Sequence, residues 1–187
     1  QVKILSNHRY ALVTGIVLAV ILAFVIDGVV FDRVAFHNLG LARWTHIVAG
    51  VFWIGLLYYF NAVQTPALAV AAADKGGPGG AGISKYVAPR ALFWFRWSAL
   101  VTWLSGAWYL GAHFPGAFSL GLTSDPVNYY HMVIGTGAWL GTIMLFNVWV
   151  LIWPNQKKVL GIVAATDEQK AAARVVAGNA SRVNFIL

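Results

Sequence analysis

Long apolar stretches alternate with short polar ones along this chain. Four apolar stretches, residues 10–31, 41–66, 89–112 and 126–153, are long enough to form helices that cross a bilayer. Such a helix needs about 20 predominantly apolar residues. The pattern therefore predicts an all-α fold, an integral membrane bundle of four transmembrane helices.

The polar stretches supply helix starts and stops. Residues 27–40 mix charged and apolar side chains, which is typical of an interfacial connection, and DKGGPGGAG at 74–82 is a loop by composition. Pro89 suits the first turn of the third helix, and Gly111 suits its end. Asp125-Pro126 pairs an N-cap carboxylate with a proline at the first helical position, so it opens the fourth helix.

Residues 161–187 differ from the preceding transmembrane domain, residues 1–160. Thr166 and Gln169 have the spacing of a capping box, and an alanine-rich, charged segment follows. This segment predicts a helix on the membrane surface. The last residues, Asn184 to Leu187, resemble the start of a further span.

Composition excludes a soluble domain, because 59% of the residues are hydrophobic, only 10% are charged and mean hydropathy is +0.70. The net charge of +7 comes from bases between the apolar stretches. These bases favour anionic lipid, not nucleic acid, as the partner. With the N-terminus in the cytoplasm, all thirteen Lys and Arg residues except Arg33 and Arg43 fall on the inner side. We therefore expect both termini to be cytoplasmic.

Two histidines lie at matching depths in the predicted bundle. His46 and His131 each lie about four residues, or about 6 Å, inside a helix that enters from the outer face. An ionisable residue within a span is a functional hypothesis by default. The chain has no cysteine, so any haem must be held without covalent attachment.

The neighbours of these histidines also suit a haem. Gly50 and Gly135 each lie one turn deeper on the face of their histidine, where a flat ring needs space. Arg43 lies on the same face as His46, nearer the surface, where it can pair with a propionate. Trp53 continues this face. We expect haem b between the second and fourth helices, with His46 and His131 as the metal ligands.

Two other interpretations of the histidines stay open. Each imidazole can instead bond a neighbouring helix, because polar side chains hydrogen-bond across helices in membranes. Alternatively, copper or zinc can bind a set drawn from His37, His46, His113 and His131.

Several strings resemble a known family. They are THIVAGVFWIGLLYYFNAVQTPAL, APRALFWFRWSALVTWLSGAWYL, YYHMVIGTGAWLGTIMLFNVWVLIWPNQKKVLG and a later ASRVN. In order and spacing they resemble the urate oxidase N-terminal domain, the membrane part of bacterial urate hydroxylases that precedes a C-terminal cytochrome c. The resemblance implies an oxidoreductase of the bacterial inner membrane that passes electrons to a c-type cytochrome, with urate as a possible substrate. Because this chain has no cysteine, we expect that cytochrome on a separate subunit or beyond Leu187.

A looser likeness to four-helix haem proteins of the copper-resistance and protoporphyrinogen-oxidase type also favours haem. The expected function is electron transfer from a quinol or small reductant to a cytochrome c. The competing interpretation is a non-catalytic accessory or scaffold subunit of a larger photosynthetic or respiratory membrane complex. The sequence indicates no catalytic residue.

Overall fold

The computed structural model describes residues 7–30 and 37–187, and every regular element within these ranges is a helix. The all-α prediction is confirmed for this part of the chain. The structure divides into two compact units, residues 1–38 and 39–187, which are described separately. Lys3 and Arg33, which entered the count of charges on each side, lie outside the described residues.

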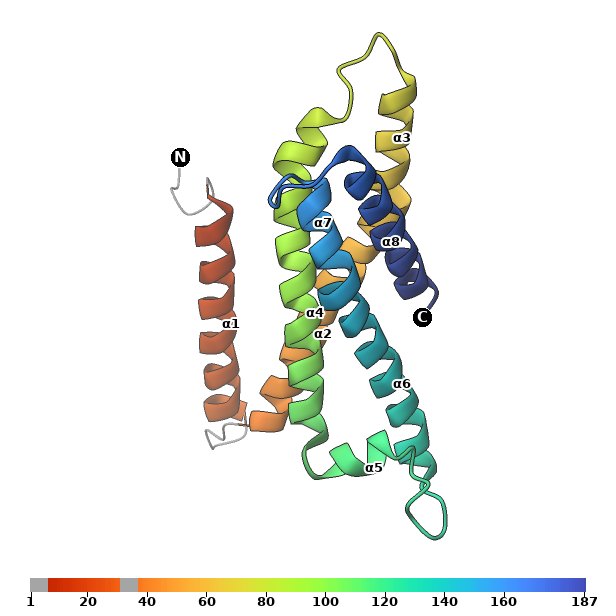
Figure 1. Cartoon of the computed structure of the whole chain (residues 1–187). Coiled ribbons are helices and arrows are strands. Elements are labelled where there is room, and N and C mark those ends of the chain that lie inside the picture. The colour runs from red at the N-terminus through yellow and green to blue at the C-terminus, as the bar shows by residue number, and fades with distance from the viewer. Residues whose placement is uncertain (1–6, 31–36) are drawn as a thin grey trace. The chain divides into compact units, whose positions relative to one another are not determined.

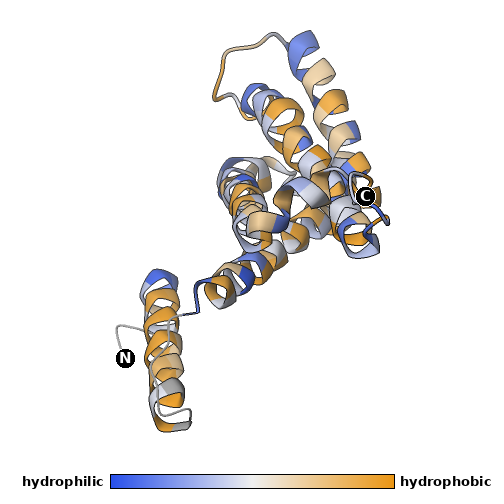
Figure 2. Cartoon of the chain, turned by 90° about the horizontal axis from the view of Figure 1, so that it is seen from below, coloured by the Kyte–Doolittle hydropathy of each residue, from blue (hydrophilic) through white to orange (hydrophobic). Residues whose placement is uncertain are grey.

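The first unit contains α1 (His8–Val30), a single apolar helix. No described side chain along it is buried, and hydrophobic residues make up most of its ribbon (Figure 2). A helix that is apolar on all sides and unburied suits a lipid environment. Its bounds agree closely with the predicted 10–31.

The second unit is a bundle built on α2 (Asn38–Tyr58), α4 (Ala88–Leu110) and α6 (Tyr129–Phe146). In Figure 1 α2 crosses behind α4, and the short α5 (Phe114–Phe118) joins α4 to α6 at one end. As predicted, α4 ends at Gly111, whose φ of +50° favours glycine. The core joins all three helices and consists of Trp53, Leu57, Leu92, Phe95, Ala99, Met144, Val148, Ile152 and Ala180.

Three prolines are each preceded by a π-helical segment. The segments are Tyr59–Gln64, Ile83–Val87 and Asn147–Ile152, and in each case the residue just before the proline donates its N–H to the carbonyl five residues back. Proline has no N–H and its ring clashes with the carbonyl four residues back, so an α-helix is disrupted there. The wider turn accommodates the ring, and the helix continues.

The helix that contains α4 begins before its predicted start at Pro89, because the π segment Ile83–Val87 continues into it. Two other helices are also longer than the sequence predicted. One runs without interruption from Asn38 to Ala73, where α3 (Thr65–Ala73) continues α2 beyond the predicted end at Pro66. The other runs from Tyr129 to Val159 and includes α7 (Trp153–Val159). Its N-cap is Asn128 and not the predicted Asp125, because the Asn128 side chain accepts the hydrogen bond from the His131 N–H. Pro66 and Pro154 do not end these helices, because the π turns absorb them.

Within the described residues, three helical stretches are long and apolar enough to cross a membrane: His8–Ile26, Asn38–Ala73 and Tyr129–Val159. The predicted count of four spans is not confirmed, because α4 is not among them. Two arginines, four tryptophans and several Ser or Thr residues lower the apolar character of α4. These polar groups suit the most enclosed helix of the bundle, where Ser98, Thr102 and Ser105 each bond a carbonyl of α4 itself.

The predicted C-terminal helix is α8 (Asp167–Ile186), and the capping box of Thr166 and Gln169 is confirmed. The helix packs on α7 and on the π segment before it, through a buried face that includes Ala173, Ala177, Ala180 and Asn184. Asn184 accepts a bond from Asn147 at 2.7 Å and donates one to the Met144 carbonyl at 3.0 Å. The helix is thus fixed to the bundle by buried polar contacts.

Candidate functional site

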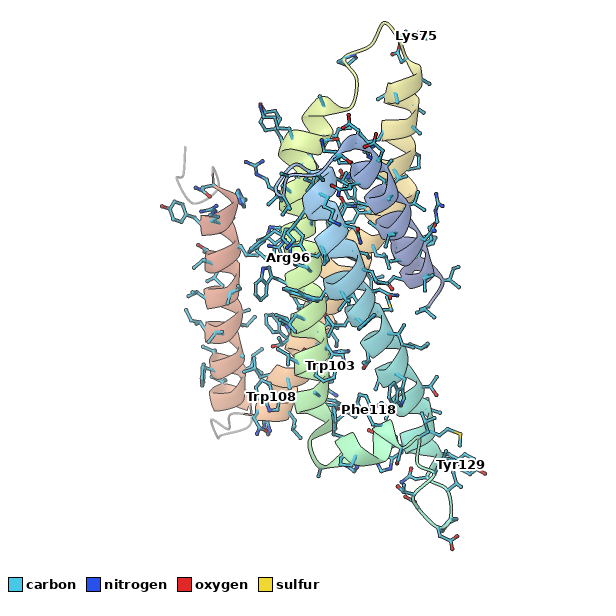
Figure 3. All side chains as sticks on the ribbon, viewed as in Figure 1. Lys75, Arg96, Trp103, Trp108, Phe118 and Tyr129 are labelled. Atoms are coloured by element: carbon cyan, nitrogen blue, oxygen red, sulfur yellow. The ribbon has the colours of Figure 1, made fainter. Side chains whose placement is uncertain are left out.

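An apolar cavity of about 620 Å³ lies between α2, α4, α5 and α6. It occupies the half of the bundle where α2 begins and α4 ends. Figure 3 shows two of its aromatic residues, Trp103 on α4 and Phe118 on α5. Trp103 Nε1 donates a 2.8 Å hydrogen bond to Thr142 Oγ1, which fixes the indole between α4 and α6.

His46 lines this cavity, and its ring has a defined orientation. Nδ1 lies 2.8 Å from the carbonyl oxygen of Thr102 on α4. A carbonyl only accepts hydrogen bonds, so Nδ1 carries the proton and Nε2 of the neutral ring keeps a free lone pair. Metal-binding histidines commonly have this arrangement, in which the second nitrogen donates to a carbonyl.

Gly106 makes room for the His46 ring. A Cβ at this position would lie 3.0 Å from both Nδ1 and Cε1 of His46, closer than ordinary van der Waals contact. The missing side chain therefore permits the ring to lie close to α4. Thr102 and Gly106, one turn apart, together position the imidazole.

Three more of the predicted site residues line the same cavity, namely Arg43, Gly50 and Trp53. Trp53 is only 4% exposed and its Nε1 has no hydrogen-bond partner, whereas Arg43 and His46 are exposed. Gly50 is uncrowded, since the nearest atom to an added Cβ is Thr102 Cγ2 at 3.8 Å. Four of the predicted residues, all on α2, thus line one cavity.

His131 and Gly135 do not line this cavity. Gly135 packs against the backbone of α5, so close that a Cβ would overlap the Ala117 carbonyl oxygen. His131 instead pairs with another imidazole, with Nε2 lying 3.1 Å from Nδ1 of His113. The physical reason is α5, which covers the face of α6 that bears both residues. The structure therefore does not bring His46 and His131 together, and His37 is an exposed residue just before α2.

The sequence interpretation missed the contribution of α4. Thr102, Trp103 and Gly106 form much of the cavity wall. A stripe of small residues at helical spacing, from Ser98 through Thr102 to Gly106, was visible in the sequence.

Among residues 7–30 and 37–187 there is no group of three or more His, Cys, Asp or Glu side chains that could hold a metal ion. Any metal held by described side chains therefore has at most two such ligands from this chain. A single axial histidine, as in haem proteins with a proximal ligand, is within this limit.

Comparison with family models, with curated proteins and with solved structures finds no match to this chain. The resemblance to the urate oxidase N-terminal domain therefore stays a prediction. The functional argument depends on the geometry of the cavity.

Proposed function

We propose that this chain is a membrane redox protein that binds one haem b in the cavity between α2, α4 and α6, with His46 as the axial ligand. One observation carries the proposal. At the wall of an apolar cavity, the Thr102 carbonyl holds the proton of His46 on Nδ1, which leaves Nε2 free to bind iron.

The size and lining of the cavity suit a flat, apolar cofactor. Its volume of about 620 Å³ falls within the range of roughly 300–1,000 Å³ that is usual for cofactor sites. Much of the lining consists of small residues, including Gly50, Gly106, Gly137, Ala138 and Gly141. A Cβ added at Gly137 or Gly141 meets no atom within 4 Å, so these positions leave open space.

Three of the lining residues, Arg43, His46 and Thr102, have a defined task in this proposal. Haem supplies one-electron chemistry when it is bound. His46 would ligate the iron through Nε2, Thr102 fixes the orientation of the His46 ring, and Arg43 would pair with a propionate. The lining is mostly apolar, and the polarity and solvent exposure of its surroundings are among the factors that set a haem potential.

The proposed electron acceptor is a c-type cytochrome, and the proposed donor is a quinol or a small reductant such as urate. His46 lies eight residues after Asn38, the first residue of α2. That spacing is about 12 Å along the helix axis, which keeps the site close to one end of the bundle. A partner docked at this end can therefore approach the cofactor. The distribution of basic residues supports placing this end at the outer face of a bacterial inner membrane, with both termini cytoplasmic.

Anaerobic spectroscopy of the detergent-purified protein tests this function. We expect a Soret band, reduction of the haem by a quinol and reoxidation by a soluble c-type cytochrome. A His113→Ala variant is the matched control, because His113 is exposed and does not line the cavity. A spectrum without a Soret band would overturn the proposal that the protein binds haem. If the protein also co-purified stoichiometrically with a larger complex, a scaffold subunit would be the better account. A Soret band without electron transfer to the cytochrome would overturn the redox role alone.

A further inference from the structure

His113 and His131 form a second imidazole group, separate from the proposed haem cavity. His113 Nδ1 lies 3.1 Å from His131 Nε2, and the ring centroids are 5.3 Å apart. The two residues come from different elements, because His113 ends the 3-10 turn after α4 and His131 lies in the first turn of α6. Neither residue lines the cavity that contains His46.

The connection between α5 and α6 holds the His131 ring in place. Asn128 caps α6 by accepting a 3.1 Å hydrogen bond from the His131 backbone N–H. The ring lies against Gly116, where an added Cβ would be 2.6 Å from Cε1. Nδ1 is buried against this backbone without a hydrogen-bond partner, so only Nε2 is available to a ligand.

The contact between α5 and α6 keeps this arrangement rigid. Gly135 lets the α6 backbone approach the Ala117 carbonyl, and Trp139 Nε1 donates a 3.0 Å hydrogen bond to the Phe118 carbonyl. His131 is therefore a fixed residue. His113 is exposed, so its ring can turn at little cost.

The distance between the two nitrogens also suits a shared metal ion. With metal–nitrogen bonds of about 2.0–2.1 Å, two ligand nitrogens lie about 2.9 Å apart at a right angle and about 3.3 Å apart at the tetrahedral angle. The observed 3.1 Å is between these values. The ion would take the lone pair of the fixed His131 Nε2 where it lies, and rotation of the exposed His113 ring would bring the His113 Nδ1 lone pair toward the same ion.

We propose that His113 Nδ1 and His131 Nε2 form a binding site for a divalent transition metal. The chain supplies two imidazoles, and water or a small ligand completes the coordination. Imidazole ligands suit Cu²⁺, Ni²⁺ and Zn²⁺, and affinity for such a site is highest for Cu²⁺. The ion would bridge the end of α4 to the start of α6. This inference does not depend on the proposed haem site.

Titration of the full detergent-purified chain with Cu²⁺, followed by calorimetry and electron paramagnetic resonance, tests the site. We expect one Cu²⁺ with hyperfine structure from two imidazole nitrogens. His113→Asn should weaken binding by roughly tenfold or more, because the amide can keep a hydrogen bond to His131 but is a poor Cu²⁺ ligand. His131→Ala should weaken Cu²⁺ binding in the same way. If His131→Ala does not fold, the result for His113→Asn decides the test.

His46→Ala is the matched control for Cu²⁺ binding. His46→Ala should remove the Soret band and leave Cu²⁺ affinity unchanged. His113→Asn should keep the Soret band and weaken Cu²⁺ binding. Cu²⁺ binding of equal affinity in the wild type and in His113→Asn would overturn the metal site and show that the pair is only a hydrogen bond. Loss of Cu²⁺ binding in His46→Ala with full binding in His113→Asn would overturn it as well, by assigning the ion to the cavity.

Discussion

The two halves of the α2, α4 and α6 bundle differ in how the same helices fill the space between them. In the packed half, large side chains of α4 such as Leu92 and Phe95 meet Leu57, Val148 and the buried face of α8. In the cavity half, α4 presents Thr102 and Gly106 instead, and a cavity of about 620 Å³ lies beside them. Side-chain size along a single helix thus separates a structural half from a candidate functional half.

The two halves also contain different polar contacts. In the packed half, Arg96 lies over the Trp153 ring at 3.8 Å from its centroid, and Asn147 and Asn184 bond to each other. The two asparagines thus satisfy each other, although Gln64 Oε1 and Trp149 Nε1 are buried in this half without a hydrogen-bond partner. In the cavity half, His46 has one ring nitrogen bonded to Thr102 and the other free. A polar group that is only half satisfied is the more natural place to look for a ligand.

The largest expected effect is on the packed half. Phe95 is 1% exposed and its ring lies 5.5 Å from that of Phe60. Phe95→Ala should lower the free energy of unfolding by about 3 kcal/mol, because it leaves a void in a close-packed region. Phe114→Ala, which enlarges an existing cavity and removes ring contacts to Trp103 and Phe118, should cost less, roughly 1 kcal/mol. Helix loss in a detergent unfolding titration measures both, and equal losses would contradict the division into halves.

Two glycines on α6 provide a sharper pair. Gly135→Ala should destabilise the protein by about 2 kcal/mol, because the methyl group would overlap the Ala117 carbonyl of α5. Gly137→Ala should instead stabilise it by roughly 0.5–1 kcal/mol, since the site is open and alanine favours a helix. The same unfolding titration gives both values. If both substitutions changed the free energy of unfolding in the same direction, the two positions would not differ in packing.

Removal of a buried hydrogen-bond partner should have an intermediate effect. Asn184→Ala leaves the Asn147 amide and the Met144 carbonyl without their contacts to α8. We expect a loss of about 1–2 kcal/mol and faster proteolysis of α8, because buried polar groups are costly when unpaired. Asn155→Ala, which breaks only a bond within its own helix segment, is the control. No difference between the two variants would mean that α8 is held by apolar contact alone.

The smallest expected effect concerns the start of α8. Thr166→Ala should cost roughly 0.5–1 kcal/mol through loss of the capping box. The backbone hydrogen bond at Glu168, and then the bond to the Thr166 side chain, lower the pKa of Glu168.

The lowered pKa of Glu168 has a pH consequence. The ionised Glu168 carboxylate stabilises the folded protein above the pKa that Glu168 has in the unfolded chain. This contribution is lost as the pH falls through the lower pKa that Glu168 has in the folded chain. In Thr166→Ala the pKa of Glu168 should rise, which carbon-13 NMR of the labelled carboxyl group can measure. An unchanged pKa of Glu168 in Thr166→Ala would show that the Thr166 side chain does not lower it.

The sequence predicted the helices better than the space between them. Apolar runs and caps located α1, α4 and α8, because these features act over a few neighbouring residues. The ends at Pro66 and Pro154 were placed too early, since a π turn that absorbs a proline leaves no distinct pattern in the sequence.

The candidate site was predictable only in part. Arg43, His46, Gly50 and Trp53 share one face of one helix, so helical periodicity alone groups them. The predicted pairing of His46 with His131 is wrong, and avoiding it required knowledge of the element that covers α6. That covering element is α5, a five-residue helix too short to be recognised in an apolar sequence.

The absorption spectrum of a His46→Gly variant, recorded with and without added imidazole, tests the central claim most directly. We predict that the wild type shows a Soret band, that the variant loses most of it, and that free imidazole restores it by entering the space left beside Gly106. An unchanged Soret band in the variant would show that His46 does not bind the haem. No Soret band in the wild type would contradict the haem itself.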